Sequence, residues 1–237
     1  TSPMAASPVP STSKGERAAR VLFGATAFGA AALVFVVQPM AAKRLLPTFG
    51  GSPSVWNTAV VFFQLVLLAG YALAHGTLRR LASRRQAVLQ VAITLVALLV
   101  PPFALAGGGF GDGIPPALRV VLILALAVGV PYLALTMASP ALQRWYADLG
   151  ARDSDDPYFL YVASNAGSLL GLLAFPLLLE RTLTSTGQLR AWSLGFAAYV
   201  LALGACAIVV ARRGRGIVLE QVRHGGGLAH FGQTVTI

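Results

Sequence analysis

Charged residues and cysteine are both scarce in this chain. Only 11% of the 237 residues are charged, and Cys206 is the single cysteine. One cysteine excludes an intrachain disulfide and a cysteine-based metal site, so we interpret Cys206 as a small packing residue inside an apolar run. The sequence also lacks a nucleophile–base–acid arrangement, an H-E-x-x-H motif and a Walker loop. We therefore expect no catalytic residue, metal site or cofactor in this chain.

Long apolar runs are abundant instead. Apolar residues make up 56% of the chain, and the mean hydropathy is +0.72. Each run is long enough to cross a hydrocarbon core of about 30 Å as a helix. A helix is expected because it pairs its own backbone N–H and C=O groups by hydrogen bonds where no water is present. The sequence predicts an all-α, polytopic membrane helix bundle at 20–213, between a disordered tail at 1–19 and a short Gly-rich tail at 214–237. We expect about six transmembrane helices, near residues 21–40, 56–78, 87–106, 118–142, 158–179 and 191–211.

Basic residues gather in the connections between these runs. The net charge is +10, and the larger basic count falls on the side of both termini. Because Lys and Arg are enriched in cytoplasmic loops, this pattern predicts a protein of the bacterial inner membrane with cytoplasmic termini. We interpret the charge as a topology signal, so the lipid bilayer is an expected partner and nucleic acid is not. The basic residues on the predicted cytoplasmic side are Lys14, Arg17, Arg20, Arg79, Arg80, Arg84, Arg85, Arg144, Arg152, Arg212, Arg213, Arg215 and Arg223.

Prolines predict where the helices end or bend. Gln38-Pro39 predicts the end of the first helix, and the segment AAKRLLP that follows is suited to the membrane interface. Pro131 predicts a kink in the fourth helix.

Two loops resemble ligand sites only superficially. Asp153, Asp155 and Asp156 form an acidic cluster, which we interpret as a solvated turn rather than a metal site. The glycine-rich run at 107–113 lacks the preceding strand that a nucleotide-binding loop needs, so we interpret it as a turn.

Polar residues form stripes on two of the predicted helices. At about 100° per residue, the four on the second helix fall within roughly 20° of one another, which predicts one face directed into the bundle. These four are Asn57, Gln64, Tyr71 and His75. On the fifth helix, one side carries Tyr158, Tyr161, Asn165 and Ser168. Beside them lies a ladder of small residues that lets another helix approach closely, formed by Ala163, Gly167 and Gly171.

Two interpretations of the stripes remain open. One is a polar cavity between the second and fifth helices for a small polar or cationic ligand. The other is a set of hydrogen bonds between helices, worth about 1 kcal/mol each. The absence of an ionised residue deep in either stripe favours the second interpretation.

Three separated segments carry a family resemblance. Residues 33–75, 136–145 (TMASPALQRW) and 156–176 (DPYFLYVASNAGSLLGLLAFP) resemble the membrane half of bacterial spermidine-synthase-like integral membrane proteins, often labelled fused MFS-type/spermidine synthase proteins. The resemblance covers about residues 20–211. It implies a soluble aminopropyltransferase or methyltransferase-type domain after the membrane region, which would bind a decarboxylated S-adenosylmethionine-like cofactor and a polyamine. Only 24 residues follow Arg213 here, without a strand–Gly-loop–helix unit, so the catalytic residues of the family have no matching positions.

The positions that match the family motifs lie within the apolar runs. They are Gln38, Pro39, Trp56, Asn57, Gln64, Gly70, Tyr71, Ser139, Pro140, Gln143, Trp145, Tyr158, Tyr161, Ser164, Asn165, Gly167 and Ser168. The resemblance implies a non-catalytic membrane module that anchors or serves a soluble synthase-like domain. Two alternatives are an MFS-like half-transporter for a small polar or cationic solute, which needs a second copy or a partner chain, and a structural membrane subunit that docks through its glycine face.

Overall fold

The computed structural model describes residues 14–99, 113–150 and 157–228, and these ranges contain helices but no strand. The all-α prediction is confirmed for this part of the chain. In chain order the elements are α1 (Lys14–Phe49), α2 (Pro53–Arg80), α3 (Ser83–Leu99), α4 (Pro116–Leu124), the π-helical turn η1 (Ala125–Gly129), α5 (Val130–Thr136), α6 (Ala138–Ala147), α7 (Tyr158–Ala174), the π-helical turn η2 (Phe175–Leu179), α8 (Glu180–Thr182) and α9 (Ser185–Leu228).

Five helical stretches are long and apolar enough to cross a membrane. They are Lys14–Phe49, Pro53–Arg80, Pro116–Ala147, Tyr158–Thr182 and Ser185–Arg212. A sixth, α3, is 17 residues long where it is described, and the rest of the predicted third run, residues 100–106, lies outside the described residues. The chain is therefore a multi-pass membrane protein with five to six long apolar helices.

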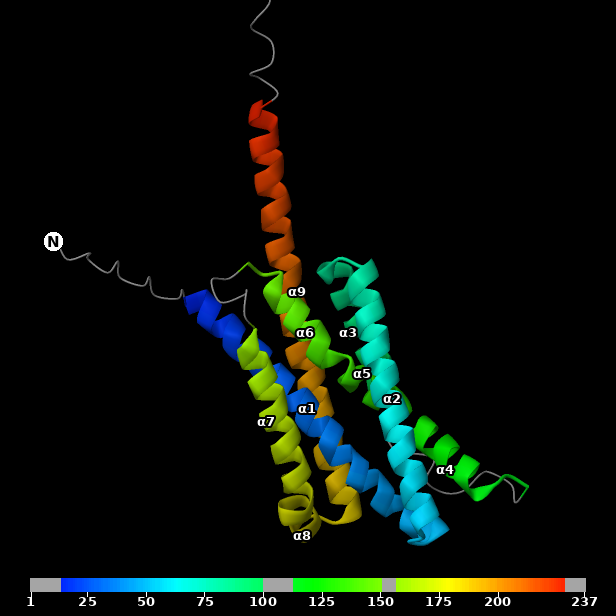
Figure 1. Cartoon of the computed structure of the whole chain (residues 1–237). Helices are drawn as coiled ribbons and strands as arrows, with labels where there is room; N and C mark the ends of the chain where they lie inside the picture. The colour runs from blue at the N-terminus through cyan, green and yellow to red at the C-terminus, as the bar shows by residue number, and fades with distance from the viewer. Residues whose placement is uncertain (1–13, 100–112, 151–156, 229–237) are drawn as a thin grey trace, which may run out of the picture.

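The long helices lie alongside one another, and α1 runs through the middle of the bundle (Figure 1). Helices α7 and α9 both pack on α1, while α2 packs on α4 and α5. At one end, the guanidinium of Arg20 on α1 lies over the ring of Phe159 on α7, and Ser83 on α3 hydrogen-bonds Asp148 after α6. We call this the basic end, because Arg79, Arg80, Arg84 and Arg85 lie at the junction of α2 and α3 there.

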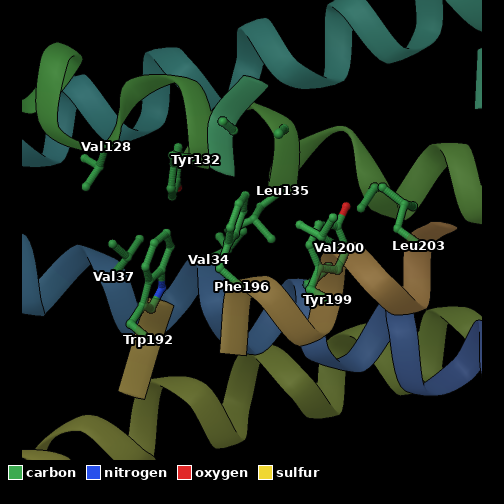
Figure 2. Packing of buried hydrophobic residues seen from close by; sticks show 14 of the residues in the cluster. Val34, Val37, Val128, Tyr132, Leu135, Trp192, Phe196, Tyr199, Val200 and Leu203 are labelled. Carbon is green, nitrogen blue, oxygen red and sulfur yellow. The ribbon is translucent and has the colours of Figure 1, made fainter. Parts of the chain in front are cut away.

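Aromatic residues of α9 organise the core. Trp192, Phe196 and Tyr199 recur at helical spacing, so they share the face that meets α1 and α5 (Figure 2). The rings of Trp192 and Phe196 stack with centroids 5.4 Å apart, and the Trp192 indole N–H donates to the Leu33 carbonyl at 3.1 Å. Across from them, α5 contributes Tyr132. These residues belong to one buried hydrophobic cluster that includes side chains of α1, α5 and α9.

The prediction that the first helix ends at Gln38-Pro39 is wrong, because α1 continues to Phe49. Proline lacks the backbone donor of a helix interior, but neighbouring groups in a membrane bundle can satisfy the carbonyls around it. Just before Pro39, Gln38 Nε2 donates to the Val34 carbonyl at 3.3 Å and to Tyr132 Oη at 3.1 Å, which ties this part of α1 to α5. The segment AAKRLLP therefore forms the last turns of α1 rather than a separate interfacial turn.

Two other prolines coincide with wide helical turns. The turn η1 ends just before Pro131, where the sequence predicts a kink, and η2 contains Pro176. The predicted domain boundaries also shift. Residues 14–19 belong to α1 rather than to a disordered tail, and α9 continues past residue 213 to Leu228.

Candidate functional site

A cavity of about 380 Å³ lies in the half of the bundle nearer the basic end. Helices α1, α2, α5, α6 and α7 form its walls, whereas α3 and α9 pack elsewhere in the bundle. Its polar lining consists of Tyr71, Thr136, Ser139, Gln143, Tyr161, Ser164, Asn165 and Ser168. Its apolar lining consists of Ala27, Ala30, Ala31, Val34, Phe35, Leu67, Leu135 and Pro140.

Close packing of α7 on α1 positions one wall. A Cβ atom at Gly167 would overlap the backbone carbonyl of Phe28, and one at Gly171 would lie 2.6 Å from the carbonyl oxygen of Ala32. Glycine is thus required for the approach of these two helices. Because Gly167 and Gly171 face α1, the adjacent face of α7, with Tyr161 and Asn165, lines the cavity.

A second close approach positions the wall formed by α2. A Cβ atom at Gly70 would overlap the side chain of Thr136, so α2 lies directly against α5 at this point. Tyr71, the next residue, reaches the cavity, and 46% of its side chain remains exposed. On α7, Tyr161 is 54% exposed. The cavity therefore reaches the outer surface of the bundle between α2 and α7.

The polar residues of α5 and α6 are part of the site that sequence reasoning missed. Thr136, Ser139 and Gln143 are spaced by three and four residues, which places them on one helical face. Gln143 Nε2 donates to Ser139 Oγ at 3.2 Å, so the two side chains are held together. This spacing was the signal that could have found them. Ser164 on α7 also lines the cavity, and like Ser139 and Gln143 it entered only through the family resemblance.

Of the eight predicted cavity residues, the structure brings together Tyr71, Tyr161, Asn165 and Ser168. Asn57, Gln64, His75 and Tyr158 do not line the cavity, and their side chains are exposed. The prediction that the whole α2 stripe faces into the bundle is therefore wrong. Helical periodicity relates the four side chains to one another, but it does not determine which way their shared face points.

The ladder of small residues packs inside the bundle. Gly167 and Gly171 are buried against α1, and Ala163 is half-buried. The glycine face is consequently occupied within the chain, which contradicts the hypothesis that it is a docking surface for another subunit.

For α2 and α7, the hydrogen bonds favour the interpretation of the polar stripes as a cavity lining over their interpretation as hydrogen bonds between helices. Ser164 Oγ donates to the Tyr161 carbonyl and Ser168 Oγ to the Ser164 carbonyl, each at 3.0 Å and within α7. Across residues 14–99, 113–150 and 157–212, the side-chain amides of Gln64 and Asn165 make no hydrogen bond. Neither of these two amides thus joins α2 to α7.

Hydrogen bonds between helices occur elsewhere, around α3. Trp145 Nε1 on α6 donates to Gln86 Oε1 at 2.6 Å, and Gln90 Nε2 donates to the Ala134 carbonyl at 2.9 Å. All four residues are fully buried. Satisfying these groups inside the bundle ties α3 to α5 and α6.

Among the described residues, no charged side chain lines the cavity. The ion pairs Lys43–Glu180, at 2.7 Å, and Arg144–Asp148, at 3.1 Å, do not contribute to it. No group of three or more metal-ligating side chains occurs within the described residues. The acidic cluster at 153–156 and the glycine run, except Gly113, lie outside them. What the cavity offers is hydroxyl groups, amides and the faces of aromatic rings.

Comparisons with protein-family models, curated proteins and solved structures find no match for this chain.

Proposed function

We propose that this chain is a non-catalytic module of the bacterial inner membrane that binds a small polar solute in the cavity between α2 and α7. The volume of about 380 Å³ falls in the range of about 300–1,000 Å³ that is typical of small-molecule sites. Eight polar side chains converge on it, within helices that are long and apolar enough to span a membrane. That convergence is the observation on which the proposal rests.

The lining indicates the class of solute. The described residues of its wall include no Lys or Arg to pair with an anion and no carboxylate to pair with a multiply charged amine. Hydroxyl groups and amides hydrogen-bond neutral polar groups. The rings of Tyr71, Tyr161 and Phe35 can also attract a single organic cation through cation–π interactions. We therefore propose a neutral polyol-like solute or a singly charged organic cation.

The role of the module in a larger system is proposed from the sequence resemblance. In a spermidine-synthase-like protein, this membrane region would anchor or serve a soluble synthase-like domain. The cavity chemistry argues that its own solute differs from the polyamine of such a domain. The basic end of the bundle, where α1 begins, is proposed to face the cytoplasm together with both termini of the chain, because arginine-rich connections are enriched there.

Solute binding can be tested with a matched pair of variants. Asn57 and Asn165 are both exposed asparagines on membrane-spanning helices, but only Asn165 lines the cavity. Binding of glycerol, choline and spermidine would be measured with the chain in nanodiscs. We expect choline or glycerol to bind, Asn165→Leu to weaken that binding several-fold, and Asn57→Leu to leave it unchanged. Tight binding of spermidine, or equal loss in both variants, would contradict the proposal.

A half-transporter is the second candidate, because the cavity reaches the surface of the bundle between α2 and α7. Transport requires that a solute site be reachable from both sides in turn, which a second half would provide. Uptake of choline or glycerol into proteoliposomes, above the leak of empty vesicles, is the expected result for a transporter. Binding without uptake would exclude the transporter and leave only the proposal of a binding module.

A further inference from the structure

The groove between α2 and α7 continues beyond the cavity along much of α1. A second hollow of about 180 Å³ lies farther from the basic end and shares Phe35 with the cavity. Trp56 and Phe63 of α2 and Leu172 of α7 line it. In Figure 1, α2 and α7 lie on either side of α1, and they are not a packed helix pair within the described residues. On one side of α1 the described bundle is closed by α9, whereas on the side of the groove no described helix fills the space between α2 and α7.

Both rims of the groove expose polar side chains within membrane-spanning helices. Gln64 on α2 and Asn165 on α7 are exposed, and neither amide has a hydrogen-bond partner among the described residues. Lipid chains cannot hydrogen-bond such groups, whereas the side chains of another protein surface can. These rims are therefore suited to contact with protein rather than with lipid.

The side chains that α2 and α7 contribute to the groove also have similar polarity at the same depth in the membrane. Tyr71 lines the cavity together with Tyr161 and Asn165, so both rims are polar nearer the basic end. Val60 lines the second hollow together with Leu172, so both rims contribute apolar side chains to the groove farther along. Two copies of the chain inserted in the same direction are related by a rotation about the membrane normal, which preserves depth. Such a rotation places the polar part of α2 opposite the polar part of α7 from the other copy, and apolar opposite apolar.

We infer that a second copy of this chain covers the groove, with α2 of each copy against α7 of the other. This arrangement repeats the same contact twice and closes a symmetric dimer, the commonest form of oligomer. The exposed amide of Asn165, which both donates and accepts, then lies at the depth of the Tyr71 hydroxyl of the partner. The two cavities then face each other across the symmetry axis, and the contact between the rims closes them off from the lipid. The inference rests on the proposed cavity, but its test requires no solute, so failure to bind solute and failure to dimerise are distinguishable.

Crosslinking in native membranes tests this pairing. Two differently tagged full-length chains, one with Tyr71→Cys and one with Asn165→Cys, would be co-expressed in a Cys206→Ala background and treated with a short bis-maleimide. We expect a crosslink that carries both tags. Leu201 on α9, 76% exposed and remote from the groove, provides the control, and Leu201→Cys paired with Asn165→Cys should give no crosslink.

The mass of the unmodified chain in nanodiscs extracted directly from membranes provides a second readout that does not depend on the cysteine variants. A mass of two chains of 24.6 kDa supports the inference. A single-chain mass together with no crosslink overturns it. So does crosslinking at Leu201 alone, or a crosslink from Asn165→Cys to a different protein.

Discussion

Replacement of Gly171 by alanine tests the packing that holds the cavity wall in place. The added Cβ atom would lie 2.6 Å from the Ala32 carbonyl oxygen and 2.9 Å from its Cα. Ordinary contact begins at 3.4 Å, so α7 must move away from α1 by about 0.8 Å. Both obstructing atoms belong to the backbone of α1, so no side-chain rotation can relieve the overlap.

The expected loss of stability follows from that displacement. A gap of about 0.5–1 Å forfeits a quarter to a half of the dispersion energy of each affected contact. The α1–α7 interface is the most extensive in the described part of the bundle, so many contacts are affected. Overpacking of this kind typically costs about 1–3 kcal/mol, and each kcal/mol lowers the melting temperature by roughly 2–4 °C in a chain of this size.

Cys206 provides the assay. It is the single cysteine, and its side chain is 0% exposed between α9 and α1, where Sγ lies 3.5 Å from Thr26 Oγ1. A thiol-reactive fluorophore should therefore label the protein only as the helices separate. The temperature at which labelling rises gives the melting temperature of the bundle in detergent or nanodiscs.

Gly29→Ala is the matched control. Gly29 lies on α1, and a Cβ atom added there would meet nothing within 4 Å. Both substitutions share the gain in helix propensity from glycine to alanine, about 1 kcal/mol, so the difference between them isolates the overlap. If Gly171→Ala melts at or above the temperature of Gly29→Ala, the reasoning about the α1–α7 contact is refuted.

Two further predictions concern polar contacts elsewhere in the bundle. Gln86→Leu and Trp145→Phe each remove one partner of a buried 2.6 Å hydrogen bond, so each should lower the free energy of unfolding by about 1–3 kcal/mol. The double variant should lose less than the sum, and simple additivity in the same labelling assay would argue against the pair acting as a unit. Lys43 and Glu180 form an ion pair whose side chains are 39% and 40% exposed, so Glu180→Gln should change stability by about 0–1 kcal/mol at most. A larger loss, insensitive to salt, would mean that this pair is shielded from solvent.

Much of the helix plan could be predicted from the sequence. The run at 56–78 corresponds to α2 at Pro53–Arg80, and the run at 158–179 to the stretch Tyr158–Thr182, because apolar length alone identifies a membrane-spanning helix. The extension of α1 beyond Pro39 could not be predicted. Proline usually ends a helix in water, whereas α1 continues through both Pro39 and Pro47 within the bundle.

The candidate site was predictable only in part. The polar face of α7 was identified by its spacing, and three of its four predicted residues line the cavity. The stripe on α2 was misplaced, since only Tyr71 reaches the site. Relative angles follow from the helical period, whereas the direction of a face depends on the neighbouring helices, which the period does not specify.

On α2 and α7, glycines marked the buried faces better than the polar residues did. In a soluble protein the apolar stripe of a helix indicates the side that packs, but in a membrane both the protein core and the lipid are apolar, so this signal is weak. Gly70 and Gly171 each face a neighbouring helix at a distance that excludes a Cβ atom. Gln64 and Asn165, in contrast, lie on exposed faces. The exposed amides of α2 and α7 therefore lie on surfaces of the bundle, at the groove between these two helices, and are not elements of the folded core.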